Sequence, residues 1–138
     1  MPYALYADGE ELHVAAWPGS AVQTRDIARF VALEGRVYVV LASGLISADT
    51  VPKDFPFYQL TKDKPEGFYN GGSCIVAPDG SWVLEPMVGG EGLIVAEIDP
   101  ARIASARYSL DPTGHYARPD VFGVTVDRRR QQALAFTD

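Results

Sequence analysis

A strand–helix–strand pattern near the start of the chain constrains the fold more than any other feature. Residues 36–44, "RVYVVLASG", form an uninterrupted apolar run rich in β-branched side chains, which is typical of a strand buried on both faces. "ELHVAAWP" (11–18) also predicts a strand, and "SAVQTRDIARFVALEG" (20–35) between them carries apolar residues at helical spacing. Two strands joined through a helix are usually parallel neighbours in one sheet, so the sequence predicts an α/β fold.

The segment 20–35 also carries the signals of a helix with defined ends. Ser20 and Gln23 fit the capping-box pattern at its start, and Gly35 is expected to end it. Mainly apolar residues recur at helical spacing along it, at Ile27, Phe30, Val31 and Leu33 or Glu34.

The second half of the chain predicts antiparallel strands. "SCIVAP" (73–78) and "SWVLEP" (81–86) are joined by Asp79-Gly80, a strong hairpin signal. "GLIVAEID" (92–99) is expected to add one more strand after a glycine turn. A helix should follow in "DPARIASARYSL", with Asp99 as its N-cap.

Three other segments complete the expected organisation. "PYALYADG" (2–9) resembles the last two turns of a helix, which is marginal unless something packs on it. The polar, proline-rich stretch 46–72 is expected to be one long loop, and such loops are usually functional or interfacial. We expect one domain portion over residues 1–127, ending in an extended stretch, and a polar C-terminal tail over 128–138. Because the face of the sheet left without helices needs a second layer, these elements suggest half of a larger α/β structure.

Composition limits the classes of partner and compartment. The 138 residues carry a net charge of −6, which argues against a nucleic-acid partner. The single cysteine excludes an internal disulfide, no apolar run approaches the length of a membrane span, and the N-terminus lacks the pattern of a signal peptide. We therefore expect a cytoplasmic protein without a membrane partner.

Three motifs together resemble a known family. "ALEGRVYVV", "GGSCIVAPDG" and "GHYARPDVF", in this order, look like the C-terminal half of a nitrilase, from the carbon–nitrogen hydrolase superfamily. The resemblance implies part of an αββα sandwich: a βαβ unit, an antiparallel hairpin or meander, a helix and an extended tail. It also implies subunits that pair through helices, so we expect a homo-oligomer or a complementing N-terminal nitrilase half as partner.

The resemblance also implies a chemistry. In that family a cysteine thiolate attacks a nitrile carbon, a glutamate acts as general base and a lysine stabilises the developing charge, giving a carboxylic acid and ammonia. All three residues lie before the segment that this chain resembles, and no position here matches them. We therefore assign no catalytic residue and no cofactor, and we expect the chain to be inactive alone. A small nitrile or amide substrate would bind only if the site were completed.

Two residues are candidates for lining such a completed site. Trp17 and Ser43 end the two predicted parallel strands, where α/β sheets tend to bind ligands. By resemblance, Ser43 lies on a strand end that approaches the family's catalytic centre. Core or interface packing is the alternative for both side chains.

The single cysteine, Cys74, is a second candidate for a functional residue, as a catalytic nucleophile. Such a cysteine needs a lowered pKa from a helix N-terminus or a neighbouring cation, whereas Cys74 falls inside a predicted strand. We interpret it as a small buried residue. A minimal thiol hydrolase, with Glu66 or Asp79 as the base, stays open as a weaker hypothesis.

The two histidines do not indicate a metal site. His13 is expected to be a partly buried, hydrogen-bonded strand residue, and His115 is expected to orient the tail or a subunit contact. Since they are far apart in the sequence and no cysteine pair accompanies them, we predict no metal site. A non-catalytic module that self-associates or regulates an intact nitrilase is the alternative function.

Overall fold

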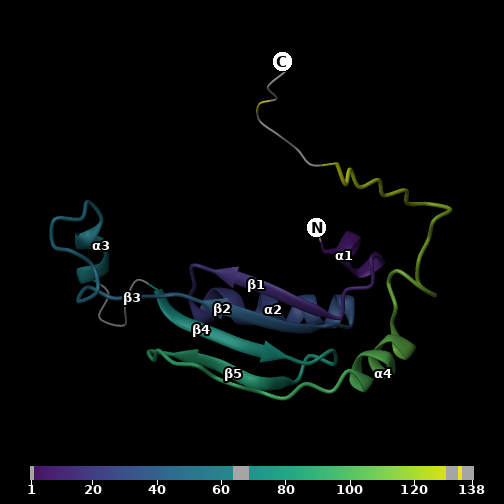
Figure 1. Cartoon of the computed structure of the whole chain (residues 1–138), viewed down its shortest axis with the longest axis horizontal. Coiled ribbons are helices and arrows are strands. Elements are labelled where there is room, and N and C mark those ends of the chain that lie inside the picture. The colour runs from purple at the N-terminus through teal and green to yellow at the C-terminus, as the bar shows by residue number, and fades with distance from the viewer. Residues whose placement is uncertain (1, 64–68, 130–133, 135–138) are drawn as a thin grey trace.

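The structure is a computed structural model that describes residues 2–63, 69–129 and 134 of the chain. Strands form one sheet, a long helix lies along it, and shorter helices flank its ends (Figure 1). In chain order the elements are α1 (Tyr3–Ala7), β1 (Leu12–Trp17), α2 (Ala21–Gly35), β2 (Tyr38–Ser43), β3 (Leu45–Ile46), α3 (Tyr58–Lys62), β4 (Tyr69–Val76), β5 (Trp82–Val88) and α4 (Ala101–Ser109). The predicted α/β fold is confirmed.

The sheet joins a parallel pair to an antiparallel hairpin. Strands β1 and β2 are parallel, with register from Leu12 opposite Tyr38 to Trp17 opposite Ser43. Strand β4 runs antiparallel to β2 and pairs on its other side with β5, while the short β3 pairs with the first residues of β4. The βαβ unit and the Asp79-Gly80 hairpin are therefore confirmed.

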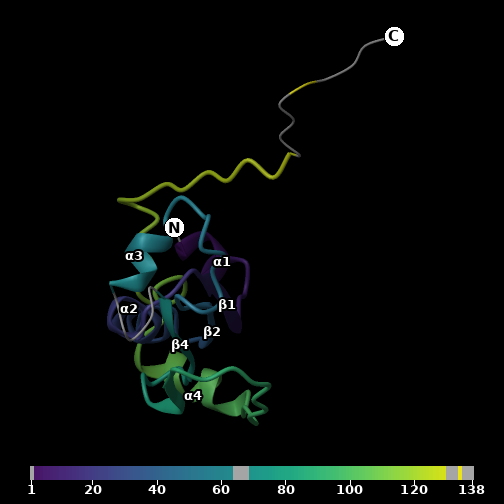
Figure 2. The same ribbon diagram turned by 90° about the vertical axis from the view of Figure 1, so that its left-hand side faces the viewer.

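Helix α2 covers one face of the sheet (Figure 2) with small side chains rather than large ones. Its buried residues are Thr24, Ala28, Val31, Ala32 and Gly35, and of these Ala28, Val31 and Ala32 pack in one cluster with buried residues of β2 and β4. Of the apolar residues at helical spacing, Val31 is buried against the sheet, whereas Ile27 is 41% and Phe30 62% exposed. Small residues let a helix lie close to a sheet, which leaves the larger apolar ones on the outer face.

The start of α2 differs from the expectation, whereas its end at Gly35 agrees with it. Ser20 precedes the helix in extended conformation, but its side chain makes no capping hydrogen bond, so the capping box with Gln23 is wrong. At the other end Arg36, not Gly35, adopts the left-handed conformation, with φ of 52°. Gly35 is needed for another reason: a Cβ there would overlap the ring of Tyr6 in α1.

The short α1 is held by this contact with α2. Tyr6 is 4% exposed, and its hydroxyl donates to the Val31 carbonyl at 3.4 Å and to Glu34 Oε2 at 3.3 Å. The chain then turns at Gly9, whose φ is +89°, as the sequence predicted. The expectation that so short a helix needs a packing partner is met within the chain.

A second, smaller cluster of buried residues involves β2 and α4. Tyr38 of β2 packs there with Ala77 and with Ile103 of α4. The Tyr38 hydroxyl donates to the Asp99 carbonyl at 3.0 Å, and the Asp99 side chain accepts the Ala101 N–H at 2.9 Å. Asp99 therefore accepts a hydrogen bond at the start of α4, although Pro100 and not Asp99 occupies the N-cap position.

Two predicted segments are wrong. Residues 92–99 form no strand in the structure, and Leu93 and Val95 are 93% and 85% exposed. A strand needs hydrogen bonds from a neighbouring strand, and none of the described strands pairs with this segment. The expected loop 46–72 instead contains α3, the second residue of β3 and the first residues of β4. Residues 110–129 form no helix or strand and include turns at 112–116 and 119–121, while most of the predicted tail 128–138 lies outside the described residues.

Candidate functional site

The carboxyl ends of β1 and β2 bring the two predicted ligand-lining residues together. Trp17 and Ser43 are direct partners in the parallel register, and the Gly44 N–H donates to the Trp17 carbonyl at 3.3 Å. Trp17 is 40% exposed, so its indole is available at this end of the sheet. The two residues therefore lie side by side, as the sequence predicted. That they line a ligand site stays a prediction.

The hydroxyl of Ser43 is covered at this end of the sheet. Ser43 Oγ is buried and has no hydrogen-bond partner among the described residues. It lies against Gly19, where an added Cβ would overlap it. A ligand at the strand ends would therefore meet Trp17 before it met this hydroxyl.

Ser73 holds the backbone of Ser43, a role that sequence reasoning missed. Ser73 Oγ accepts the Ser43 N–H at 3.0 Å and donates to the Ser43 carbonyl at 3.4 Å. Backbone pairing of β2 with β4 is regular only as far as Leu41 opposite Cys74. Beyond that point the Ser73 side chain replaces the backbone hydrogen bonds between β2 and β4, and it fixes the end of β2.

The glycines of "NGGS", which the sequence placed at the end of the expected loop 46–72, lie inside β4. Gly71 and Gly72 have φ of +92° and +110°, and the pairing with β5 is irregular beside them. A Cβ on Gly72 would stand 2.8 Å from the backbone N of Ala21, the first residue of α2. Paired glycines within a strand pattern indicate a bulge or a close backbone approach, and this signal could have been used.

Asn70 supplies the cap that Ser20 does not. Its Oδ1 accepts the Ala21 N–H at 3.4 Å, across 49 positions of sequence. The start of α2 is therefore fixed by β4, next to the strand ends that carry Trp17 and Ser43. No local pattern in the sequence could have shown this contact.

Cys74 has the environment of a core residue. It is 1% exposed in β4, and burial raises the pKa of its thiol to about 11. A nucleophilic cysteine requires the opposite shift. Of the two hypothetical bases, Asp79 lies in the hairpin turn, where hydrogen bonds from Ser81 and then from Arg102 lower the pKa of its carboxyl to about 2. Glu66 lies outside the described residues.

We expect iodoacetamide to alkylate Cys74 at pH 8 at least about a hundredfold more slowly in the folded chain than in urea. A pKa raised from 9.0 to about 11 lowers the thiolate fraction by about that factor, and burial of the sulfur adds to the protection. Mass spectrometry of timed samples measures both rates. Equal rates would show that the thiol is accessible and would reopen the nucleophile hypothesis.

His13 is placed as the sequence suggested, while the role expected of His115 stays a prediction. His13 is partly buried, with Nδ1 at 2.9 Å from Glu10 Oε1. The exposed His115 ring lies 4.8 Å from the ring of Tyr116, centroid to centroid. Among the described residues no three metal-ligating side chains gather in one place.

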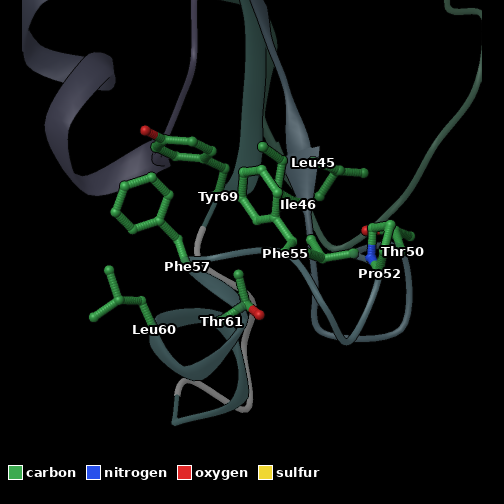
Figure 3. A pocket seen from close by; sticks show the side chains of 10 residues that line it. Leu45, Ile46, Thr50, Pro52, Phe55, Phe57, Leu60, Thr61 and Tyr69 are labelled. Atoms are coloured by element: carbon green, nitrogen blue, oxygen red, sulfur yellow. The ribbon is translucent and has the colours of Figure 1, made fainter.

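The segment between β2 and β4 forms a hollow that the sequence did not reveal. It has a volume of about 740 Å³ and lies between β3, α3 and the start of β4 (Figure 3). It begins at Leu45, two residues after Ser43, and so it borders the strand ends. Its side chains are mainly apolar, and their chemistry is considered below.

Comparison with known proteins identifies similar sequences along most of the chain. The profile of the family described as carbon–nitrogen hydrolase matches residues 1–108. A bromoxynil-specific nitrilase of Klebsiella pneumoniae subsp. ozaenae is 37% identical, over 96% of this chain and 40% of the nitrilase. An arylacetonitrilase of Macrophomina phaseolina is 31% identical, over 96% of this chain and 43% of that enzyme.

The lengths of these relatives differ from that of the chain. The chain spans about 40% of the length of the two nitrilases. A nitrilase-like protein of Saccharomyces cerevisiae is 38% identical over 72% of this chain, and that alignment takes in 91% of the yeast protein. In the part of the chain that the structure describes, none of the helices has the length and apolar character that crossing a bilayer requires.

Proposed function

Because this chain belongs to the carbon–nitrogen hydrolase family, we propose that it forms the supporting part of a nitrile-hydrolysing site. The observation that carries the proposal is its similarity to nitrilases over 96% of its own length but only about 40% of theirs. In this proposal the catalytic cysteine, glutamate and lysine lie outside the chain, in a region preceding the one that it resembles. The substrate is a small nitrile, or an amide of similar size.

The chain would contribute the carboxyl ends of β1 and β2 to the completed site. Trp17 offers an exposed indole there, and Ser43 is held in place through its backbone by Ser73. The start of α2 is fixed beside them by Asn70. These residues supply shape and position, while the bond-breaking groups come from the complementing part.

The exposed apolar surface supports a complementing partner. On the outer face of α2, Val22 is 80% and Phe30 62% exposed, and on β1 Val14 is 67% exposed. The strand-like segment 92–99 is also open to solvent. Large exposed apolar areas and unpaired strand-forming segments favour association. We propose a homo-oligomer or a complementing nitrilase half as partner, acting in the cytoplasm.

The alternative function is a non-catalytic module that associates with itself or with an intact nitrilase. The same exposed apolar faces favour this alternative, because association through them does not depend on an active site. Sedimentation velocity separates the two proposals when it is combined with an activity assay. A chain that assembles stably and never supports ammonia release, even beside a complementing half, supports the alternative.

Ammonia release from aliphatic and aromatic nitriles tests the main proposal. We expect none from the chain alone or from its Cys74→Ala variant. We expect release when the chain is added to a nitrilase relative from which the aligned region has been removed. The control adds a Gly72→Val chain, which is expected to be destabilised and should therefore restore less.

Two results would contradict this proposal. Turnover by the chain alone that disappears in Cys74→Ala would make Cys74 the nucleophile. Failure of restoration, with the folded chain shown to bind the shortened nitrilase, would leave the non-catalytic module. Turnover that survives Cys74→Ala in the isolated chain would be traced to a contaminating enzyme by further purification.

A further inference from the structure

The hollow beside α3 is built from side chains that are apolar and incompletely covered. Figure 3 shows rings and branched side chains from three separate segments turned toward one space. Phe55, Phe57 and Leu60 are 48%, 60% and 53% exposed, although large apolar side chains are stabilised by burial. The main contributors are Leu45, Ile46, Phe55, Phe57, Leu60 and Tyr69.

The position of the hollow is one at which α/β proteins bind ligands. In Figure 1, α3 lies beyond the end of the sheet toward which β1 points. The hollow therefore opens past the carboxyl ends of the parallel strands, the usual place for a ligand in an open α/β sheet. Its volume of about 740 Å³ falls within the range of small-molecule sites, which is about 300–1,000 Å³.

We propose that this hollow binds an uncharged small molecule that carries an aromatic ring. Phe55 and Phe57 already contact each other edge to face, with ring centroids 5.7 Å apart and planes at 69°. A third ring can extend this arrangement, since aromatic rings prefer edge-to-face and offset contacts. An apolar cavity of about 150 Å³ can hold benzene, so there is room here for a substituted ring.

The absence of charge in the lining selects against ionised ligands. None of the described lining residues carries a charge. The two threonines of the lining are engaged in their own turns: Thr61 Oγ1 donates to the Tyr58 carbonyl at 2.6 Å, and Thr50 Oγ1 donates to the Ser47 carbonyl at 2.9 Å. An ionised group would lose its hydration here without gaining a partner of opposite charge. This inference rests on the hollow alone and holds whether or not the proposed nitrile hydrolysis is correct.

Fluorine NMR titration of the full chain tests the inference with two matched probes. 4-Fluorobenzamide is uncharged, and 4-fluorobenzoate has nearly the same shape but is ionised at neutral pH. We expect the amide to bind about tenfold more tightly than the benzoate, a difference of about 1.4 kcal/mol. Cyclohexanecarboxamide, added as a competitor, should displace the fluorinated amide less effectively than benzamide does.

Variants assign the binding to this hollow. Phe57→Ala is expected to weaken 4-fluorobenzamide about tenfold, and Leu60→Gln gives a second test on α3. Phe30→Ala is the matched control, because Phe30 is also an exposed phenylalanine, 62% exposed, but lies on α2 away from the lining. It should leave the affinity unchanged. Circular dichroism confirms that each variant keeps its fold.

Several results would overturn the inference. These are no binding of 4-fluorobenzamide at millimolar concentration, equal binding of the benzoate, or stronger competition by the cyclohexane compound. An equal loss in Phe30→Ala would place the binding elsewhere. If the amide affinity falls as protein concentration rises, and Phe57→Ala changes the sedimentation coefficient, then a second copy of the chain occupies the hollow instead.

Discussion

Gly72→Val is expected to lower the free energy of unfolding by about 3 kcal/mol or more. Two costs combine at this position. The backbone φ of +110° is one that β-branched residues rarely adopt, and a Cβ would lie 2.8 Å from both N and Cα of Ala21. These are backbone atoms at the start of α2, so they can move only if the helix shifts. Urea unfolding followed by circular dichroism measures the loss.

Gly89→Val separates the two costs. Gly89 follows β5 with φ of +75°, and nothing lies within 4 Å of its added Cβ. It carries the conformational strain without the collision, so we expect a loss of about 1–2 kcal/mol. If both variants lose the same stability, the close contact between β4 and α2 contributes nothing, and the account of the Gly71-Gly72 bulge is wrong.

The difference between these two glycines also shows what a sequence can reveal. Strands β1, β2, β4 and β5 could be predicted because each has its own pattern of apolar residues and a turn signal at its end. The pairing of Trp17 with Ser43 followed from the parallel arrangement alone. Features that depend on residues far apart could not be predicted in this way. The Asn70 cap on α2 and the contact of Gly72 with Ala21 are of this second kind.

What the sequence did not predict has the same physical origin. Residues 92–99 have strand-forming composition, yet a strand also needs a neighbour to pair with. Of the helically spaced apolar residues of α2, Val31 packs in the core but Phe30 does not, and the small residues Ala28 and Ala32 fill the contact with the sheet. Which of two apolar faces packs inward depends on the surface opposite it, and a single segment does not contain that information.

Within the candidate site, the sequence indicated the location but not the orientation of the side chains. That Ser43 lies at a strand end could be predicted, whereas the approach of Gly19 to its hydroxyl could not. The hollow beside α3 was hidden for a similar reason. Its side chains are spread over residues 45–69, and only the folded chain brings them together.

Gly19→Ala is expected to cost about 3 kcal/mol, and Ser43→Ala should return about 1 kcal/mol of that loss. Gly19 has φ of +90°, and its added methyl would overlap Ser43 Oγ, lie 2.9 Å from Ser43 Cβ and lie 3.2 Å from the Gly44 N. Removing the hydroxyl relieves the worst of these contacts and leaves the strain and the other two. Rescue should therefore be partial.

The single variant Ser43→Ala completes the cycle and bears on the site. Because Ser43 Oγ is buried without a hydrogen-bond partner among the described residues, its removal alone should change stability by less than about 0.5 kcal/mol, or raise it. Urea unfolding of the wild type, both single variants and the double variant gives the coupling energy. Coupling of about 1 kcal/mol would show that the Ser43 hydroxyl packs against Gly19. The hydroxyl is then occupied by this contact and does not face a ligand. Additive losses would mean that the hydroxyl does not lie against Gly19, and it would then be free to face a ligand beside Trp17.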